Sequence, residues 1–300
     1  MKQYISLFFR MILAVPFFMS ACSIGSSDTK VITVASKDFT EQFILGEIYA
    51  QLLEEEGFQV ERKLDLGGTP VAHEAITNGE IDLYPEYTGT GLLTILKLPA
   101  SSDREEVFHT VASGYEERFE LIWLEPAPMN NTQALAMTQA GAQEFGIRTI
   151  SDMVVHAEEL VMVGPPEFRE REDGLPGLKE IYGDFELKDY RDVDPGLRYQ
   201  VLTSGQADVT VAFGTDGEIS AYDLVVLEDD RNMFPPYQVA PVVRREVLNR
   251  YPEIEEILNR VAPLLTDEVM REMNFEVSGN QREPEDVARD FLVENNLTGK

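Results

Sequence analysis

Short apolar runs alternate with longer amphipathic segments along most of the chain. The run VITVAS at 31–36 predicts a strand, and the segment 38–57, which ends at a glycine, predicts a helix. Asp38 lies three residues before Glu41, a spacing that predicts a capping box at the start of this helix. Further strands are predicted at 58–66, 81–86, 160–164, 207–213 and 223–229. This alternation predicts an α/β fold with parallel sheets that bind ligands at the carboxyl ends of their strands.

One of these patterns occurs twice in the chain. The segments NGEIDLYPEYTGTG, from Asn78, and SGQADVTVAFGTDG, from Ser204, align without gaps. In each, a helix is expected to end at a glycine, a strand follows, and an aromatic residue, Tyr87 or Phe213, precedes a Thr/Gly turn. We therefore expect two similar lobes, each presenting one aromatic ring at the carboxyl edge of its sheet.

Two proline-rich segments, at 125–133 and 232–241, mark where the chain would pass between the lobes. If it crosses at the first and returns at the second, the first lobe contains 31–130 together with 240–300, and the second contains 131–239. Two crossings form a hinge, and closure around a ligand is its ordinary use. The helical C-terminal stretch would pack back on the first lobe.

The first residues have the layout of a secretory signal. Lys2 and Arg10 precede the apolar run MILAVPFFM, which is too short to span a bilayer, and small residues then lead to Cys22. We expect a signal peptide at 1–21, a lipid anchor on Cys22 and a flexible tether at 22–30. The alternative is an ordinary cleaved signal next to an unrelated cysteine. Either reading predicts a periplasmic or cell-surface protein.

The chain is strongly acidic. It carries a net charge of −29 over 300 residues, and 43% of its residues are hydrophobic, which is enough for a large core. Such a charge repels nucleic-acid phosphates, so no nucleic-acid partner is expected. The acidity suits either a high-salt habitat, where screening relieves self-repulsion, or an ordinary acidic extracytoplasmic protein.

The motifs of common enzymes and metal sites do not occur in the sequence. Cys22 is the single cysteine, and His73, His109 and His156 lack metal-binding spacing. The segment LGGTP lacks the lysine and the spacing of a phosphate-binding loop. We expect no catalysis, no metal and no cofactor, although the abundant acids leave a hydrolytic carboxylate pair open.

Aromatic residues stand where a ligand is expected. A quaternary ammonium ion cannot donate a hydrogen bond, so proteins hold it against aromatic faces, at roughly 0.5–2 kcal/mol per ring. Tyr87 and Phe213 end the two repeated strands, and Tyr237 lies in the second crossing. Their shared placement favours a cage for such a cation, and the alternative for each ring is ordinary packing.

Several motifs carry a resemblance to a known family. SKDFTEQFILGEI, DLYPEYTGT, NNTQALAM, DPGLRYQ and FPPYQVAP resemble the substrate-binding proteins of ABC importers for glycine betaine, choline and related osmoprotectants, over nearly all of 31–295. The resemblance implies a type II periplasmic-binding-protein fold with two lobes, two mixed or parallel sheets and a hinge. It also implies a small quaternary-ammonium ligand, ABC permease subunits as partners, and a monomer.

The family's binding residues can be carried over by motif. Its aromatic cage implies ligand contacts for Tyr87, Phe213 and Tyr237. The fourth aromatic position falls on Gln133, which has no π face. Loss of one ring would cost about 1 kcal/mol, or about fivefold in affinity, unless Gln133 marks a larger or more polar ligand.

The resemblance also implies contacts to a ligand carboxylate. Lys37, Thr90 and Arg171 match the family's carboxylate-contacting positions. Choline has no carboxylate to match them, so a betaine is favoured. We expect an extracytoplasmic solute-binding protein that delivers glycine betaine or a related compatible solute to a permease. The alternatives are a choline, carnitine or other osmolyte binder, and a sensor without transport.

Overall fold

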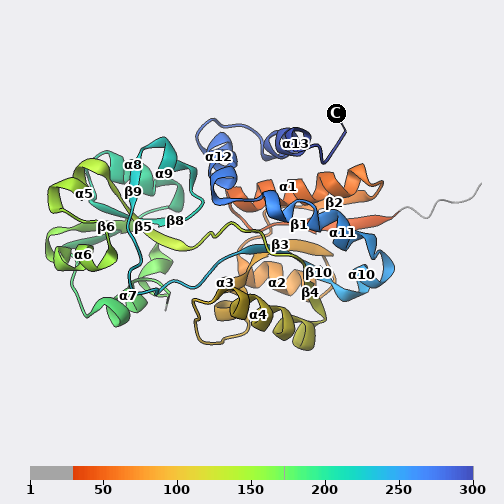
Figure 1. Ribbon diagram of the computed structural model, residues 1–300, viewed down its shortest axis with the longest axis horizontal. Helices are drawn as coiled ribbons and strands as arrows, with labels where there is room; N and C mark the ends of the chain where they lie inside the picture. Colours follow the sequence, from red (N-terminus) through yellow and green to blue (C-terminus); the bar gives the residue numbers. More distant parts are fainter. Residues whose placement is uncertain (1–29, 172, 300) are drawn as a thin grey trace, which may run out of the picture.

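The computed structural model describes residues 30–171 and 173–299, which form two mixed sheets (Figure 1). The first sheet has the order β2-β1-β3-β10-β4 and the second has the order β7-β6-β8-β5-β9. The strands of the first are β1 (Val31–Ala35), β2 (Gln59–Lys63), β3 (Leu83–Tyr87), β4 (Leu121–Trp123) and β10 (Val239–Arg244). Those of the second are β5 (Gln133–Thr138), β6 (Val161–Gly164), β7 (Asp189–Asp192), β8 (Val209–Phe213) and β9 (Leu224–Val226).

Each sheet carries its own helices and forms one lobe. The first lobe has α1 (Thr40–Glu55), α2 (Thr69–Thr77), α3 (Thr88–Thr90), α4 (Arg104–Phe119), α10 (Arg245–Arg250), α11 (Glu253–Asn259), α12 (Asp267–Ser278) and α13 (Pro284–Glu294). The second has α5 (Gln139–Phe145), α6 (Ile150–Val155), α7 (Leu175–Tyr182), α8 (Arg198–Thr203) and α9 (Gly217–Ala221). Shorter 3-10 and π turns are η1 (Gly91–Ile95), η2 (Ala157–Glu159), η3 (Pro166–Arg169), η4 (Pro195–Leu197) and η5 (Ala262–Leu264).

The chain passes between the two lobes at two places. It leaves the first sheet after β4 to begin β5 in the second, and it returns between β9 and β10. In the first lobe β1 and β3 pair in parallel, and β10, which follows the return crossing, pairs antiparallel to β3. In the second lobe β6 and β8 pair in parallel, and β5, which follows the first crossing, pairs antiparallel to β8. The fold is therefore the predicted two-lobed α/β arrangement with two connecting segments.

Apolar side chains cover both faces of the first sheet. On one face, α1, α11 and α13 share a core with β1 and β3 that includes Ile44, Leu258 and Phe291. On the other face, Ile76 of α2 and Val111 of α4 share a second core with β4. Helices on both faces explain why β3 is buried along its whole length and β10 along nearly all of it.

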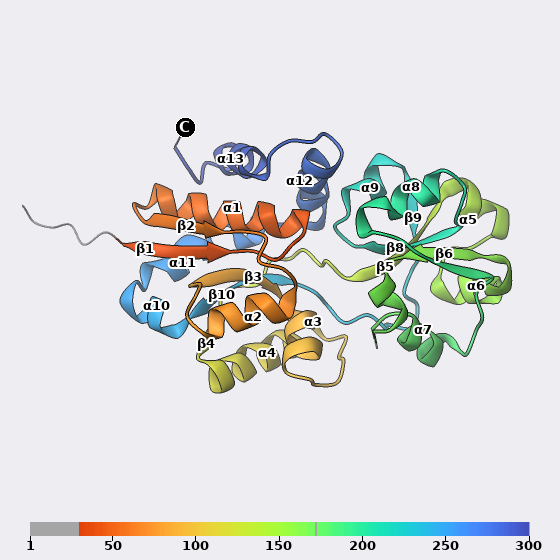
Figure 2. The same cartoon turned by 180° about the vertical axis from the view of Figure 1, so that it is seen from behind.

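The C-terminal helices lie on the first lobe, and one of them reaches the second. Helix α13 packs along α1, whereas α12 contacts both α1 and α9 of the second lobe (Figures 1 and 2). Besides the two crossings, α12 is thus a further bridge between the lobes. Among the described residues, no helix is both long enough and apolar enough to span a membrane.

Most of the expected strands are confirmed, but the start of the first helix was predicted wrongly. Helix α1 begins at Thr40 with Phe39 as its N-cap, and no side chain caps it. Asp38 makes no capping bond, and Glu41 is buried and bonded elsewhere. The predicted signal peptide 1–21, Cys22 and the tether up to residue 29 lie outside the described residues. The exact boundaries of the lobes stay a prediction.

Candidate functional site

The two tyrosines of the predicted cage meet at the turn that follows β3. Tyr87 is the last residue of this fully buried strand and is the register partner of Val239 in β10. The ring of Tyr237, two residues before β10, lies against Gly89, where an added Cβ would come within 2.7 Å of the ring. Only glycine allows the ring to approach the backbone this closely. Residues 150 positions apart in sequence are therefore placed around one turn.

The second lobe brings its two predicted residues to the same region. Phe213 ends β8, Gln133 begins β5, and the two are register partners in the antiparallel pair. The Gln133 amide donates a hydrogen bond of 2.7 Å to Asp173, and the Tyr237 hydroxyl donates another of 2.7 Å to the same oxygen. Asp173, which sequence reasoning missed, thus joins a residue of the second sheet to a ring at the second crossing.

Lys37 follows β1 and is almost completely buried. Its ammonium lies 2.6 Å from Glu86 Oε1 and 4.8 Å from the centre of the Tyr87 ring. The exposed fractions of the two side chains are 4% and 0%, so this ion pair is shielded from solvent. Lys37 is therefore next to the predicted cage, but its charge is already balanced by a carboxylate of its own lobe.

The other two predicted carboxylate contacts differ in their surroundings. The Arg171 guanidinium donates two hydrogen bonds to Asp173, of 2.7 and 2.5 Å, and 44% of its side chain is exposed. This bidentate pair holds the pKa of Asp173 below its ordinary value against the opposing effect of burial. Thr90 ends the short helix α3 and is half-buried. A ligand carboxylate at Arg171 would share the guanidinium with Asp173.

A second carboxylate that sequence reasoning missed lies between the lobes. Glu41 Oε1 accepts hydrogen bonds from Tyr87, at 2.6 Å, and from Asn131, at 2.8 Å. Its Oε2 accepts from Thr215 of the second lobe, at 2.5 Å, and from Asn274 of α12, at 2.9 Å. Burial raises the pKa of the Glu41 carboxyl above its ordinary value, although these hydrogen bonds oppose the shift.

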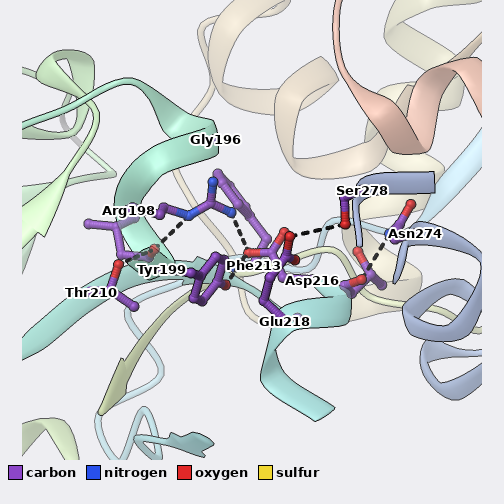
Figure 3. Close-up of polar contacts among 12 residues, drawn as sticks. Gly196, Arg198, Tyr199, Thr210, Phe213, Asp216, Glu218, Asn274 and Ser278 are labelled. Atoms are coloured by element: carbon purple, nitrogen blue, oxygen red, sulfur yellow. Dashed lines mark hydrogen bonds and ion pairs between the residues drawn. The ribbon is translucent and has the colours of Figure 1, made fainter. Parts of the chain in front are cut away.

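The loop after β8 is held by a network around Asp216 (Figure 3). One carboxylate oxygen of Asp216 accepts from the Arg198 guanidinium, the Tyr199 hydroxyl and the backbone N–H of Phe213, at 2.6 to 2.7 Å. The Arg198 guanidinium also lies 5.7 Å from the centre of the Phe213 ring. Phe213 is thus positioned by its backbone and by a neighbouring cation.

Helix α12 of the first lobe holds the same loop from the other side. Asn274 donates to the backbone oxygen of Thr215 at 2.8 Å, and Arg271 donates to that of Gly214 at 2.7 Å. Figure 3 shows Ser278 of α12 reaching Glu218 of α9, a hydrogen bond of 3.0 Å. These bonds place the carboxyl end of β8 relative to the first lobe.

The seven residues predicted to bind a ligand are joined by a continuous series of contacts or short chain segments. These residues are Lys37, Tyr87, Thr90, Gln133, Arg171, Phe213 and Tyr237. Their roles toward a ligand stay predictions. Glu41 was mistaken for a capping residue, although its place in an apolar helix start was a signal of burial. Asp173 lies in a run of charged residues and gave no such signal.

Comparison with known families matches residues 30–294 to the substrate binding domain of ABC-type glycine betaine transport systems. The ergothioneine transport permease/ergothioneine binding protein of Helicobacter pylori is 37% identical over 266 residues. The alignment covers 88% of this chain, which spans about half the length (48%) of that relative. The carnitine transport binding protein of Listeria monocytogenes is 34% identical, covering 98% of this chain and 97% of its own.

A solved structure agrees with these relatives. The crystal structure of a glycine betaine/carnitine/choline ABC transporter superposes on this chain with a TM-score of 0.81 at 28% sequence identity. The superposition covers 89% of this chain and 99% of that one.

Proposed function

The chain belongs to the substrate-binding domains of ABC-type glycine betaine transport systems, and from this premise we propose that it captures a betaine between its lobes and delivers it to a permease. A betaine here means a compound that carries both a quaternary ammonium group and a carboxylate. The protein itself performs no chemistry on this ligand in our proposal.

One observation supports this proposal above the others. Tyr87 and Tyr237 come from distant parts of the chain and lie at one turn, with the Lys37 ammonium 4.8 Å from the Tyr87 ring. Two rings at one turn offer the aromatic faces that attract a trimethylammonium group. Phe213 and Gln133 reach the same region through Asp173 and the β5–β8 pair.

The ligands after which the relatives and the family are named share two chemical groups. Ergothioneine and carnitine, after which two relatives are named, and glycine betaine, after which the family is named, all combine a trimethylammonium group with a carboxylate. A ligand carboxylate would share Lys37 with Glu86 and Arg171 with Asp173, whereas choline has no carboxylate to offer these two cations. Gln133 stands where the family usually has an aromatic residue. Its amide favours a betaine with additional polar groups, which could form hydrogen bonds with it.

Isothermal titration of the purified chain tests the proposal directly. The ligands to be titrated are glycine betaine, carnitine, ergothioneine, choline and ectoine. We expect at least one betaine to bind with a dissociation constant in the micromolar range or below. Choline is expected to bind at least tenfold more weakly than the best betaine. Failure of every betaine to bind, with the protein folded by circular dichroism, would contradict the proposed function.

We also propose that Cys22 carries a lipid that anchors the protein on the outside of a bacterial membrane. The segment FMSAC after the apolar run supports this, and the long acidic domain would then stand clear of the membrane on residues 22–30. Metabolic labelling with a tagged fatty acid should mark the wild-type chain and not the Cys22→Ser variant. Labelling of both proteins would refute the anchor.

A further inference from the structure

The charges around the predicted cage are balanced with one exception. Three cations there are each paired with a carboxylate: Lys37 with Glu86, Arg171 with Asp173 and Arg198 with Asp216. Within residues 30–171 and 173–299, no cation lies within 4.0 Å of Glu41. Glu41 is 3% exposed, so solvent does not screen its charge either.

Glu41 is surrounded by neutral donors. Tyr87 and Asn131 donate to one oxygen, while Thr215 and Asn274 donate to the other. All four neighbours can donate, so the ionised form of Glu41 has two hydrogen bonds at each of its oxygens. A buried charge that has hydrogen bonds but no opposite charge favours the arrival of a cation nearby.

The hydrogen bond from the Tyr87 hydroxyl connects Glu41 to a ring of the predicted cage. The phenol donates to Glu41 Oε1 at 2.6 Å, a short bond typical of a charged acceptor. This bond fixes the rotation of the hydroxyl and draws its proton toward the carboxylate. The electron density of the ring rises as a result, and so does its attraction for a cation on its face.

We propose that Glu41, acting through the Tyr87 hydroxyl, is the residue that makes the site select a cationic head group over a neutral one of the same shape. It is a positioning and specificity-determining residue, and it does not touch the ligand. The inference rests on the proposed function, namely that a betaine binds against Tyr87. A role limited to holding the lobes together would affect charged and neutral ligands alike.

A pair of ligands that differ in one atom separates these two roles. In 3,3-dimethylbutanoate a carbon replaces the quaternary nitrogen of glycine betaine, and the carboxylate is retained. Titration of glycine betaine, and competition by 3,3-dimethylbutanoate, give the ratio of the two affinities for wild type and for Glu41→Gln. We expect this ratio to fall on the order of tenfold in the variant, with the affinity for 3,3-dimethylbutanoate changed less than twofold.

The possible outcomes separate the inference from the function on which it rests. Equal weakening of both ligands in Glu41→Gln leaves the ratio unchanged and overturns the inference, while the proposed function stands. Failure of the wild type to bind any betaine refutes the proposed function and the inference with it. A tenfold fall in the ratio supports both.

Two further variants provide the control and a second test. Glu47 lies on the same helix, is buried and pairs with Arg62 at 3.0 Å, so Glu47→Gln repeats the chemical change away from the cage. The ratio should stay within twofold of wild type in Glu47→Gln. Tyr87→Phe keeps the ring and removes the link to Glu41, and we expect the ratio to fall about threefold. An unchanged ratio in Tyr87→Phe overturns the inference even if Glu41→Gln does not fold.

Discussion

The carboxyl ends of β3 and β8 occupy matching places in the two lobes, but their aromatic residues have different surroundings. Asp82, before β3, accepts a hydrogen bond of 2.8 Å from the backbone of Thr33 in the neighbouring parallel strand. Asp208, before β8, accepts one of 2.8 Å from Val161 in the corresponding strand of the second lobe. The repeated aspartate thus anchors the same strand pair in both lobes.

The backbone before the two strands matches as well. Gly79 and Gly205 both have positive φ values, of 75° and 72°, which glycine adopts without strain. The strand ends then diverge, because Tyr87 is buried with its hydroxyl on Glu41, whereas Phe213 is half-buried and has no hydroxyl. The repeat therefore preserves the placement of a ring at each strand end, while the electrostatic surroundings of the ring differ between the lobes.

Removal of the two rings should have unequal effects. We expect Tyr87→Ala to lower the affinity for the best betaine by about a hundredfold and Phe213→Ala by about tenfold, since the ring linked to a carboxylate attracts a cation more strongly. Titration calorimetry measures both, with thermal unfolding as the control for stability. An equal loss of affinity in the two variants would contradict the proposed difference between the two rings.

Removal of the two repeated aspartates should have similar effects on stability. Asp82→Ala and Asp208→Ala each leave a backbone N–H of a neighbouring strand without its partner, at a cost of about 1–3 kcal/mol in the free energy of unfolding. Asp82 also lies 3.4 Å from Arg244, so its loss should be the larger of the two. Urea unfolding gives both values, and a negligible effect of either variant would show that the repeat is not structural there.

The affinity for a betaine should depend on pH through Glu41. Burial raises the pKa of this carboxyl, and the groups that face it are Tyr87, Asn131, Thr215, Asn274 and the nearby Asp216. A nearby cation favours the ionised form of Glu41. The affinity for a betaine should therefore be highest above the pKa of Glu41 and should fall as the pH drops through that pKa. Titrations at successively lower pH should show a decrease in affinity that is absent from Glu41→Gln.

The smallest expected effect comes from restoring an aromatic residue in the second lobe. Gln133→Tyr adds a π face next to Phe213, and we expect about a fivefold gain in affinity for glycine betaine. The variant also loses the hydrogen bond from Gln133 to Asp173. A lower affinity for glycine betaine would indicate that Gln133 contributes to recognition of a more polar ligand.

Local patterns in the sequence predicted the two-lobed α/β class and six of the ten strands in the described residues, but not β4, β5, β7 or β10. Apolar runs between amphipathic segments predicted the strands and helices, and the repeat around Tyr87 and Phe213 predicted two lobes with rings at matching edges. These features depend on periodicity and turn chemistry, which act over a few residues and can be recognised in one chain.

Which charges are paired depends on contacts between distant segments that the sequence alone does not reveal. The bond between Glu41 and Asn274 joins residues 233 positions apart, and that between Asp173 and Tyr237 joins residues 64 apart. Any of the many acids of this chain could have occupied such positions, because a carboxylate looks the same in sequence whether it is solvated or buried. Its partners follow from which distant segments share its space, and packing of the whole chain determines that.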